Sequence, residues 1–451
     1  TWVLPAHVGL KLRSYPLDIW DQPEPPEETV DLFAAETAFA LAELMHLLGE
    51  RLHPWIGHRI RAEIERRVFQ VWYGDAAPQN WELKTNNWPA VCAGSGGAAA
   101  LYLVDDPERL AGMVWRTIQA LRMHLEGFDE SGATPEGLMY WEYGFGFFAY
   151  FSELLRAKTG GRIDLLQGVK QRNIARFPSA CILSGGKAVN FSDSGERAEL
   201  WPGLPALLAA RCGAEFGGET AEALRIPLND NGVPRLAHML RGLIWPEVYG
   251  RLGGGDGGET GHAVEHHYFE GHQWLISKVR RGGRLFAFAA KAGHNEEPHN
   301  HNDIGHFILH ADGVNVLCDL GTGVYTRQYF MPEHRYDTWA AGSHGHSVPG
   351  IGAARQRCGI DARAEDVECR RGDDSVIFSF EMAKAYGVDT LVSLRRTFEW
   401  NAGDPGRLEL TLTDRFVFAD ADGTGGADSV QETFIAAVEP KLAAPGTVRI
   451  G

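Results

Sequence analysis

The chain changes its hydrophobic period about halfway along its length. In the first half, apolar residues recur every third or fourth position, which is the spacing of one face of an α-helix. The first such stripe follows Pro25-Pro26 and runs to Gly49, and a second ends near Gly74. The same spacing predicts further helices over residues 88–104, 107–126, 144–158, 197–212 and 234–243. Paired helices joined by short loops indicate an α-helical toroid or bundle.

In the second half, apolar and polar residues alternate, which is the period of a β-strand. Strands are predicted over residues 267–279, 284–291, 303–311, 313–319, 374–382, 390–399, 407–416 and 429–438. The dipeptide Asp312-Gly313 between two of them is typical of a tight hairpin turn. Strands separated by turns favour an antiparallel β-sandwich. Between the two halves, residues 250–261 are rich in glycine, which is typical of a linker.

The composition limits the class of protein. A length of 451 residues exceeds one ordinary core, so we expect a multidomain α + β protein with a helical domain at residues 1–249, a linker at 250–261 and a β-sandwich at 262–451. No run of about 18 apolar residues occurs, so we expect no membrane-spanning helix. The formal net charge of −16 argues against a nucleic-acid partner, although a local basic cleft could still bind an anionic polysaccharide.

Two loops in the helical half mix aromatic, amide and carboxylate side chains. One covers residues 81–89 and the other covers residues 134–144. Such loops are usual in sugar-binding clefts, because aromatic faces stack on sugar rings while amides hydrogen-bond the hydroxyl groups. The candidates for substrate binding in these loops are Asn87, Trp88, Glu136, Trp141 and Tyr143.

Histidines are concentrated at the start of the strand half. Twelve of the 18 histidines fall between His262 and His346. In an extended segment residues i and i+2 share a face, so His299 and His301 can point the same way. Asp319 ends a neighbouring strand, and with His301 and His346 it would form a site of two histidines and one carboxylate for a divalent metal. The alternative is that these three residues are unrelated.

Three segments carry recognisable motifs: Asn86-Asn87-Trp88, the loop from Glu136 to Gly144, and the run from His299 to Phe307 with Cys318 to Gly321. Together, and in this order, they resemble the heparinase II/III family of polysaccharide lyases. The resemblance extends from about Trp81 to Tyr329 and more weakly to about Phe416. It implies an incomplete (α/α) toroid followed by an antiparallel β-sandwich, with a cleft between them. It also implies a secreted or periplasmic protein, and because the chain begins with Thr1 we expect a trimmed N-terminus.

The same resemblance implies roles for individual residues. Asn86 falls where the family neutralises the substrate carboxylate, and Tyr140 and His299 fall at its catalytic tyrosine and histidine. The zinc ligands of some members fall at His301, Asp319 and His346. We expect one divalent metal, zinc or else manganese. As a structural ion it would pin the hairpin to the loop around His346, and as a Lewis acid it would bind the carboxylate; we favour the structural role.

These roles suit a carbon–oxygen lyase that acts on polysaccharides (EC 4.2.2.-). Cleavage of a 4-linked uronic acid removes the C5 proton and expels the C4 oxygen, and donors such as Asn86 and His299 would stabilise the developing charge on the carboxylate. Tyr140 would donate to the leaving oxygen and act as the base for one C5 epimer, with His299 as the base for the other. The expected substrate is an anionic polysaccharide: heparan sulfate, chondroitin sulfate, hyaluronan or alginate.

Two further assignments and two other functions stay open. Arg327 and Arg335 are candidates for binding a sulfate or a second uronate, because arginine grips such groups with two hydrogen bonds. One alternative function is a glycoside hydrolase with Glu136 and Glu142 as its carboxylate pair. The other is a non-catalytic carbohydrate-binding protein. A homodimer is open as well.

Overall fold

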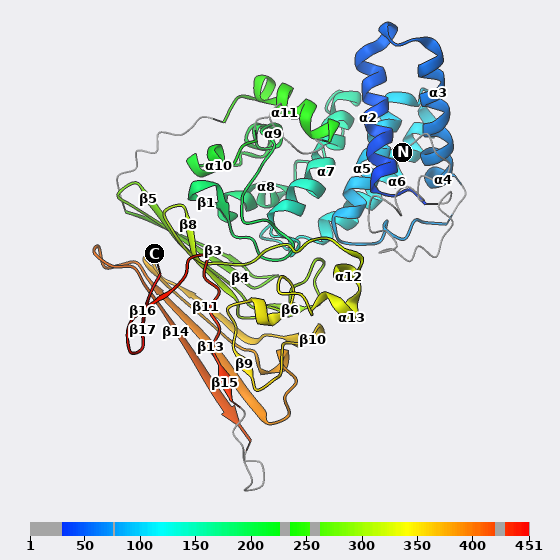
Figure 1. Ribbon diagram of the computed structural model, residues 1–451. Helices are drawn as coiled ribbons and strands as arrows, with labels where there is room; N and C mark the ends of the chain where they lie inside the picture. Colours follow the sequence, from blue (N-terminus) through cyan, green and yellow to red (C-terminus); the bar gives the residue numbers. More distant parts are fainter. Residues whose placement is uncertain (1–28, 75–76, 226–234, 253–261, 420–428, 451) are drawn as a thin grey trace.

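The computed structural model describes residues 29–74, 77–225, 235–252, 262–419 and 429–450 (Figure 1). Helices fill its first half and antiparallel strands fill its second half, so the predicted mixture of helix and sheet is confirmed. The helix start predicted at Pro25-Pro26 lies outside the described residues, as does most of the linker predicted at residues 250–261.

The helical half follows the predicted pattern, with differences in its bounds. Its helices are α2 (Leu32–Leu48), α3 (Pro54–Ile64), α4 (Gln70–Tyr73), α5 (Asn87–Leu103), α6 (Pro107–Glu126), α7 (Leu138–Lys158), α8 (Val169–Cys181), α9 (Gly203–Cys212), α10 (Gly218–Glu222) and α11 (Leu236–Tyr249). A π-helical turn at Glu65–Phe69 joins α3 to α4 within the second predicted helix. The hydrophobic pattern missed α8, which contains Pro178, and α10, which is only five residues long.

Glycines in helix α5 let helix α7 pack closely against it. A Cβ atom on Gly94 would lie 2.8 Å from the carbonyl oxygen of Phe147, and one on Gly97 would lie 2.7 Å from the ring of Phe151. Both distances are shorter than a carbon contact allows, so only glycine fits at these positions. The close packing positions α7, whose first turn carries Tyr140.

Helix α2 and the turn after it, Leu32–Arg51, are long and apolar enough to cross a membrane by length and composition alone. However, Ala38 and Phe39 of this helix lie in the core, and the carboxylate of Glu43 pairs with Arg241 at 2.7 Å. The core helix of a globular protein meets the same criterion. We therefore interpret α2 as a core helix.

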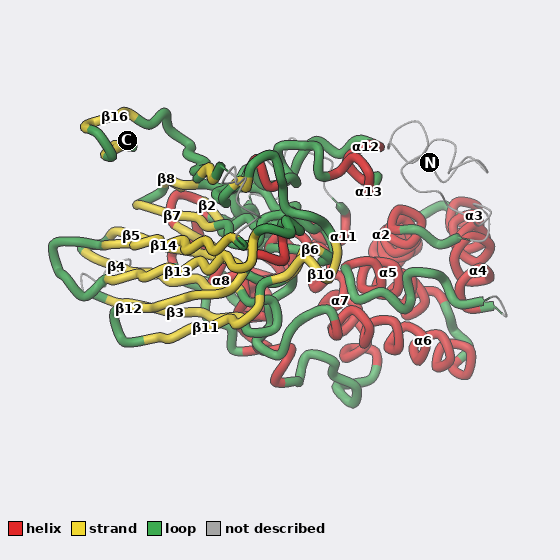
Figure 2. Tube along the Cα trace, turned by 90° about the horizontal axis from the view of Figure 1, so that it is seen from below, coloured by secondary structure: helices red, strands yellow, loops and turns green. Residues whose placement is uncertain are grey.

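The strand half contains two larger antiparallel sheets (Figure 2). The first has the order β3 (Ala263–Phe269), β4 (Trp274–Arg281), β5 (Arg284–Lys291), β7 (Phe307–Ala311) and β8 (Val314–Leu317). The second has the order β11 (Glu365–Arg371), β12 (Ser375–Glu381), β13 (Leu391–Asn401) and β14 (Glu409–Phe418). Shorter pairs join β1 (Ile182–Leu183) to β2 (Lys187–Ala188), β6 (His294–Asn295) to β10 (Gly359–Arg363), β9 (Gly350–Ile351) to β15 (Val430–Gln431), and β16 (Lys441–Ala444) to β17 (Thr447–Arg449).

Two strand predictions were wrong in part, and strands β10 and β11 were missed. The strand predicted at residues 267–279 is two strands, because the chain turns before Gln273, which takes a left-handed φ of 54° that its sequence does not signal. The segment predicted at 429–438 forms a strand only at Val430–Gln431, with one isolated bridge at Ala436. Strands β10 and β11 were missed because they are polar and mostly exposed.

Strand β4 is buried on both faces and joins the two halves. Trp274 and Ile276 point into the core that this sheet shares with the helices, whereas Leu275 points into the core between the two sheets. Successive side chains of a strand point to opposite faces, so one strand serves both cores. Lys278, on the helix-facing side, donates to the carbonyl oxygen of Ile182 at 2.6 Å. This packing attaches the sheets to the helical half.

The histidine-rich segment lies where the two halves meet. It runs from β6 through β7 and β8 to a loop that contains α12 (Arg327–Phe330) and α13 (Pro332–Arg335), which lie between the helices and the sheets in Figure 1. The predicted turn is present: Asp312 and Gly313 have positive φ angles of 43° and 93°. Both central residues of a type I′ hairpin turn need such angles.

Candidate active site and metal cluster

Tyr140 and His299 come from different halves of the chain and are in contact. Tyr140 lies in the first turn of α7, and His299 lies in the loop between β6 and β7. Their rings stack with centroids 3.8 Å apart and planes inclined by 22°. His299 has a φ of 60°, a left-handed conformation that is strained for a residue other than glycine and is often found at functional sites. The fold therefore brings two of the predicted catalytic side chains together.

The hydroxyl group of Tyr140 lies 2.6 Å from the hydroxyl group of Tyr325. Burial raises the pKa of Tyr140 well above its ordinary value, and Tyr325 and Asp193 raise it further. A phenol with a raised pKa keeps its proton at neutral pH, so Tyr140 suits the role of a proton donor. Tyr325 was not predicted; the only sequence signal was its place shortly after the Asp319 motif.

Glu136 lies between Asn87, at the start of helix α5, and His299. Its Oε1 accepts a hydrogen bond from Asn87 Nδ2 at 2.8 Å and lies 3.6 Å from His299 Nε2. Burial raises the pKa of Glu136, an effect that His299 opposes. Asn86 is the N-cap residue of helix α5: its Oδ1 accepts a hydrogen bond from the backbone N–H of Trp88 at 3.1 Å. The amide that lies beside Glu136 is therefore Asn87, and Asn86 precedes it at the start of the same helix.

Asp193 is a central residue of the site that the sequence did not reveal. It is fully buried in the segment between β2 and α9, and its carboxylate contacts four side chains. These are His299, His301, Tyr329 and Arg335. Burial acts to raise the pKa of Asp193, but the hydrogen bonds with the two histidines outweigh it and hold the pKa well below its usual range. An isolated aspartate in a loop carries no signal of such partners.

Three predicted aromatic contacts have partners other than Tyr140 and His299. Trp141 is fully buried in the helical core, and its indole N–H donates to the carbonyl oxygen of Ile174 at 2.9 Å. Its ring therefore has no surface for a sugar to contact. Tyr143 donates to Glu36 and lies under the guanidinium group of Arg235. Trp88 is half-buried, with the ammonium group of Lys84 5.8 Å from its ring centroid.

The two predicted arginines differ from each other. Arg335 is buried: its Nη2 donates to Asp193 at 3.0 Å and its Nε donates to the carbonyl oxygen of Asn300 at 2.9 Å. Its guanidinium group also stacks on the ring of Tyr329. These bonds already engage the group, so Arg335 compensates the buried charge of Asp193. Arg327 is exposed in α12, where it remains a predicted substrate contact.

Glu142 does not form a carboxylate pair with Glu136. It is buried in α7, and its Oε1 accepts from the backbone N–H of Trp201 at 2.6 Å. Burial raises its pKa to about 7. The two carboxylates thus bind different partners, Asn87 and Trp201, which argues against a hydrolase built on them.

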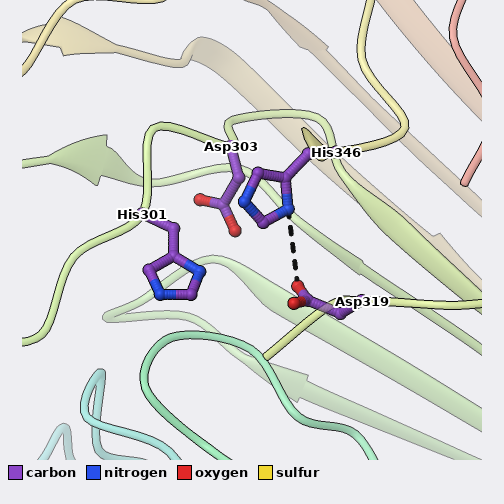
Figure 3. Close-up of side chains that lie close together, drawn as sticks. All are labelled: His301, Asp303, Asp319 and His346. Carbon is purple, nitrogen blue, oxygen red and sulfur yellow. Dashed lines mark ion pairs between the residues drawn. The ribbon is translucent and has the colours of Figure 1, made fainter. Parts of the chain in front are cut away.

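A cluster of four side chains can hold a metal ion. One ligand atom from each of His301, Asp303, Asp319 and His346 lies within 4.8 Å of all the others. Figure 3 shows the two rings and the two carboxylates around a common centre, with Nδ1 of His346 3.6 Å from an oxygen of Asp319. The predicted ligands therefore meet, and Asp303 joins them. Asp303 was not predicted, although it follows His301 by two positions, the same spacing that separates His299 from His301.

The donor atoms of this cluster fit a cation. Nδ1 of His301, Oδ2 of Asp303 and Nδ1 of His346 are buried, and none has a hydrogen-bond partner among the described residues. Oδ1 of Asp303 is held by Lys291, and Oδ2 of Asp319 lies 3.2 Å from Nε2 of His306. Burial lowers the pKa of His346 to about 4, so its ring is neutral at pH 7, as a metal ligand must be. Lys291, with its Nζ 2.7 Å from Asp303, compensates only one of the two buried carboxylates. A divalent ion would supply the missing positive charge.

The chain is similar to one family model and to several solved structures. Residues 265–424 match the family model described as Heparinase II/III-like, C-terminal. A search of curated proteins finds no match. Among solved structures, the fold is similar to the heparan sulfate lyase HepC from Pedobacter heparinus, with a TM-score of 0.58 and 12% identity over 86% of this chain and 54% of that one.

A mutant of that enzyme (TM-score 0.55, 12% identity, 80% of this chain and 48% of that one) and a heparinase III gene product (TM-score 0.54, 13% identity, 86% of this chain and 51% of that one) are also similar. At this level of identity the likeness establishes the fold alone. The chain spans about half the length of these structures.

Proposed function

We propose, on the premise that residues 265–424 match the heparinase II/III-like C-terminal family model, that this chain is part of a polysaccharide lyase. Its substrate would be a glycosaminoglycan or another uronate polymer such as alginate. The likeness of the fold to heparan sulfate lyases supports this class. The observation that carries the proposal is the stack of Tyr140 on His299, a phenol beside an imidazole at the junction of the two halves.

In the proposed reaction a uronic acid loses its C5 proton, its C4–O bond breaks, and a C4=C5 double bond forms. His299 accepts the C5 proton through Nε2, and Tyr140 gives its proton to the leaving C4 oxygen. We assign to Asn86 the hydrogen bond that stabilises the charge developing on the substrate carboxylate. The raised pKa of Tyr140 leads us to retain His299 as the only base, which narrows the two-base scheme expected from the sequence.

The reaction can be tested directly with heparan sulfate, chondroitin sulfate, hyaluronan and alginate. A lyase leaves an unsaturated uronate, so ultraviolet absorbance should rise for at least one polymer and not for its boiled-enzyme blank. A hydrolase would shorten the polymer without this absorbance, and a binding protein would retain the polymer intact. Either of the last two outcomes would overturn the proposal.

We propose that the metal cluster holds one zinc ion, with manganese as the alternative, and that the ion is structural. When bound, such an ion would link the loop before β7 to Asp319 and to the loop of His346. Ligands on separate segments suit a brace, because the binding free energy then adds to the free energy of unfolding. The residues that would hold it are His301, Asp303, Asp319 and His346.

Replacing His346 by alanine should lower both the metal content and the melting temperature. The stabilisation lost should be about 2.7 kcal/mol if the ion is present at 100 times its dissociation constant. Elemental analysis and thermal unfolding, each with and without a chelator, provide the measurement. His344→Ala is the matched control, because His344 lies two residues away and outside the cluster. If the ion were catalytic, its loss would instead reduce activity and leave the melting temperature unchanged.

The detailed architecture and the cellular location are also proposals. We propose that the helices form an incomplete (α/α) toroid and that the two sheets form a β-sandwich. The core shared by Leu275 and Phe288 of the first sheet with Phe378 and Phe398 of the second supports the sandwich. We propose a secreted or periplasmic location on the family resemblance alone.

A further inference from the structure

One buried carboxylate lies between the candidate active site and the metal cluster. Oδ2 of Asp193 is 2.8 Å from Nδ1 of His299, and Oδ1 is 3.0 Å from Nε2 of His301. Tyr329 donates its hydroxyl proton to Oδ1, and Nη2 of Arg335 lies 3.0 Å from Oδ2. Each oxygen of Asp193 therefore has one histidine and one further partner.

An ionised carboxylate can only accept hydrogen bonds, so each of its partners must donate. The guanidinium group of Arg335 is always a donor, and it keeps the charge of Asp193 compensated. With Asp193 as acceptor, His299 must carry a proton on Nδ1 and His301 must carry one on Nε2. The ring nitrogen that makes the hydrogen bond thus decides which nitrogen is left with a lone pair.

The lone pairs left over point toward the two sites. In a neutral His299 ring the bare atom is Nε2, which lies 3.6 Å from Oε1 of Glu136. In His301 the bare atom is Nδ1, which is buried without a hydrogen-bond partner among the described residues and belongs to the four-residue cluster. A general base and a metal ligand each need a free imidazole lone pair, and in both rings it stands on the side away from Asp193.

We infer that Asp193 is the positioning residue for both sites: its single carboxylate selects the Nδ1–H form of His299 and the Nε2–H form of His301. In this way it presents one ring to the substrate and the other to the metal. The kinetic part of this inference rests on the proposed lyase function, whereas the part that concerns the metal cluster does not. Loss of Asp193 should therefore affect catalysis and metal binding together.

The wild-type protein provides the first test. Histidine labelled with ¹⁵N in the rings reports by NMR which nitrogen is protonated, and His299→Ala and His301→Ala identify the two signals. In metal-free protein, at a pH where the rings are neutral, we expect His299 as the Nδ1–H form and His301 as the Nε2–H form. Added Zn²⁺ should shift the Nδ1 signal of His301. Either ring in the opposite form would overturn the inference.

The second test is Asp193→Asn, which keeps the shape but replaces one acceptor oxygen by a donor. We expect kcat to fall about 10²–10⁴-fold with KM little changed, because the base would be presented in the wrong form. Zinc affinity, measured by titration, should fall about 10–100-fold. Asp164→Asn is the matched control: it makes the same change at a carboxylate that pairs with Arg211 in the helical half at 2.6 Å, so kcat and zinc affinity should change little.

The outcomes separate this inference from the proposed function. If the wild type cleaves no polymer, the lyase proposal fails, and the ring forms and the zinc titration still decide the role of Asp193. If the wild type is a lyase and folded Asp193→Asn keeps its kcat, its zinc affinity and both ring forms, the positioning role alone fails. Should Asp193→Asn not fold, the wild-type NMR measurement decides.

Discussion

Replacing Tyr140 by phenylalanine is expected to lower kcat by about 10²–10⁴-fold, the usual contribution of a positioned proton donor. The phenyl ring can still stack on His299, so the geometry around the imidazole should persist. Within the described part of the chain the hydroxyl group makes one hydrogen bond, to Tyr325, and its loss should cost only about 1 kcal/mol of folding stability. The measurement is the initial rate of ultraviolet absorbance on the best polymer of the panel.

The effect should be confined to the chemical step. KM should change little, because phenylalanine keeps the shape of the side chain and the proton transfer belongs to the transition state. Tyr102→Phe is a suitable control, since it removes another hydroxyl group of the helical half, one that donates to Glu43. If Tyr140→Phe turns over at the wild-type rate, Tyr140 is not the proton donor.

The second large effect is expected for His299→Ala, which should also lower kcat by about 10²–10⁴-fold. With His299 as the only base, the loss should appear on polymers of either C5 epimer that the wild type cleaves. Under the two-base scheme, activity on one epimer would survive. Polymers rich in glucuronate and polymers rich in iduronate, assayed side by side, distinguish these results.

Free imidazole offers a stricter test of the same residue. In His299→Ala the missing ring leaves space next to Tyr140, so added imidazole should restore part of the rate if the ring acts as a base. His294→Ala is the control: His294 lies in β6, earlier in the same segment, and its Nδ1 accepts from the backbone N–H of Glu296. Full activity of His299→Ala without imidazole would remove the imidazole from the mechanism.

Much of the candidate site was within reach of sequence reasoning because its motifs are local. The i+2 spacing of His299 and His301, the hairpin at Asp312-Gly313 and the aspartate at the end of the next strand together predicted a metal cluster. The structure brings His301, Asp319 and His346 together. Contact between Tyr140 and His299 was expected from the family resemblance, and their rings do meet.

Other predictions failed because they depended on how the chain packs. Trp141 stands in a loop-like sequence of aromatic and polar residues, but the loop ends at Leu138 and the tryptophan lies on the buried face of α7. Arginine is a usual anion-binding residue, but the guanidinium group of Arg335 already binds the carboxylate of Asp193, 142 positions earlier in the chain. A sequence position does not state which side chains will surround it.

For this protein the sequence alone determined the switch from helical to strand period, the resemblance to a family and three of the four residues in the cluster that could hold a metal. The period depends on residue spacing along the chain, which backbone geometry converts directly into shared faces. The cluster residues lie in turns and loops, so their residue types and the family resemblance predicted them, and a shared strand face did not. Only the tertiary structure decided that Asp193 lies between His299 and His301, from which it is separated by 106 and 108 positions. The physical reason is burial. A charged group removed from water must be paired, and its partners can come from any part of the chain that the fold brings close, however distant in sequence.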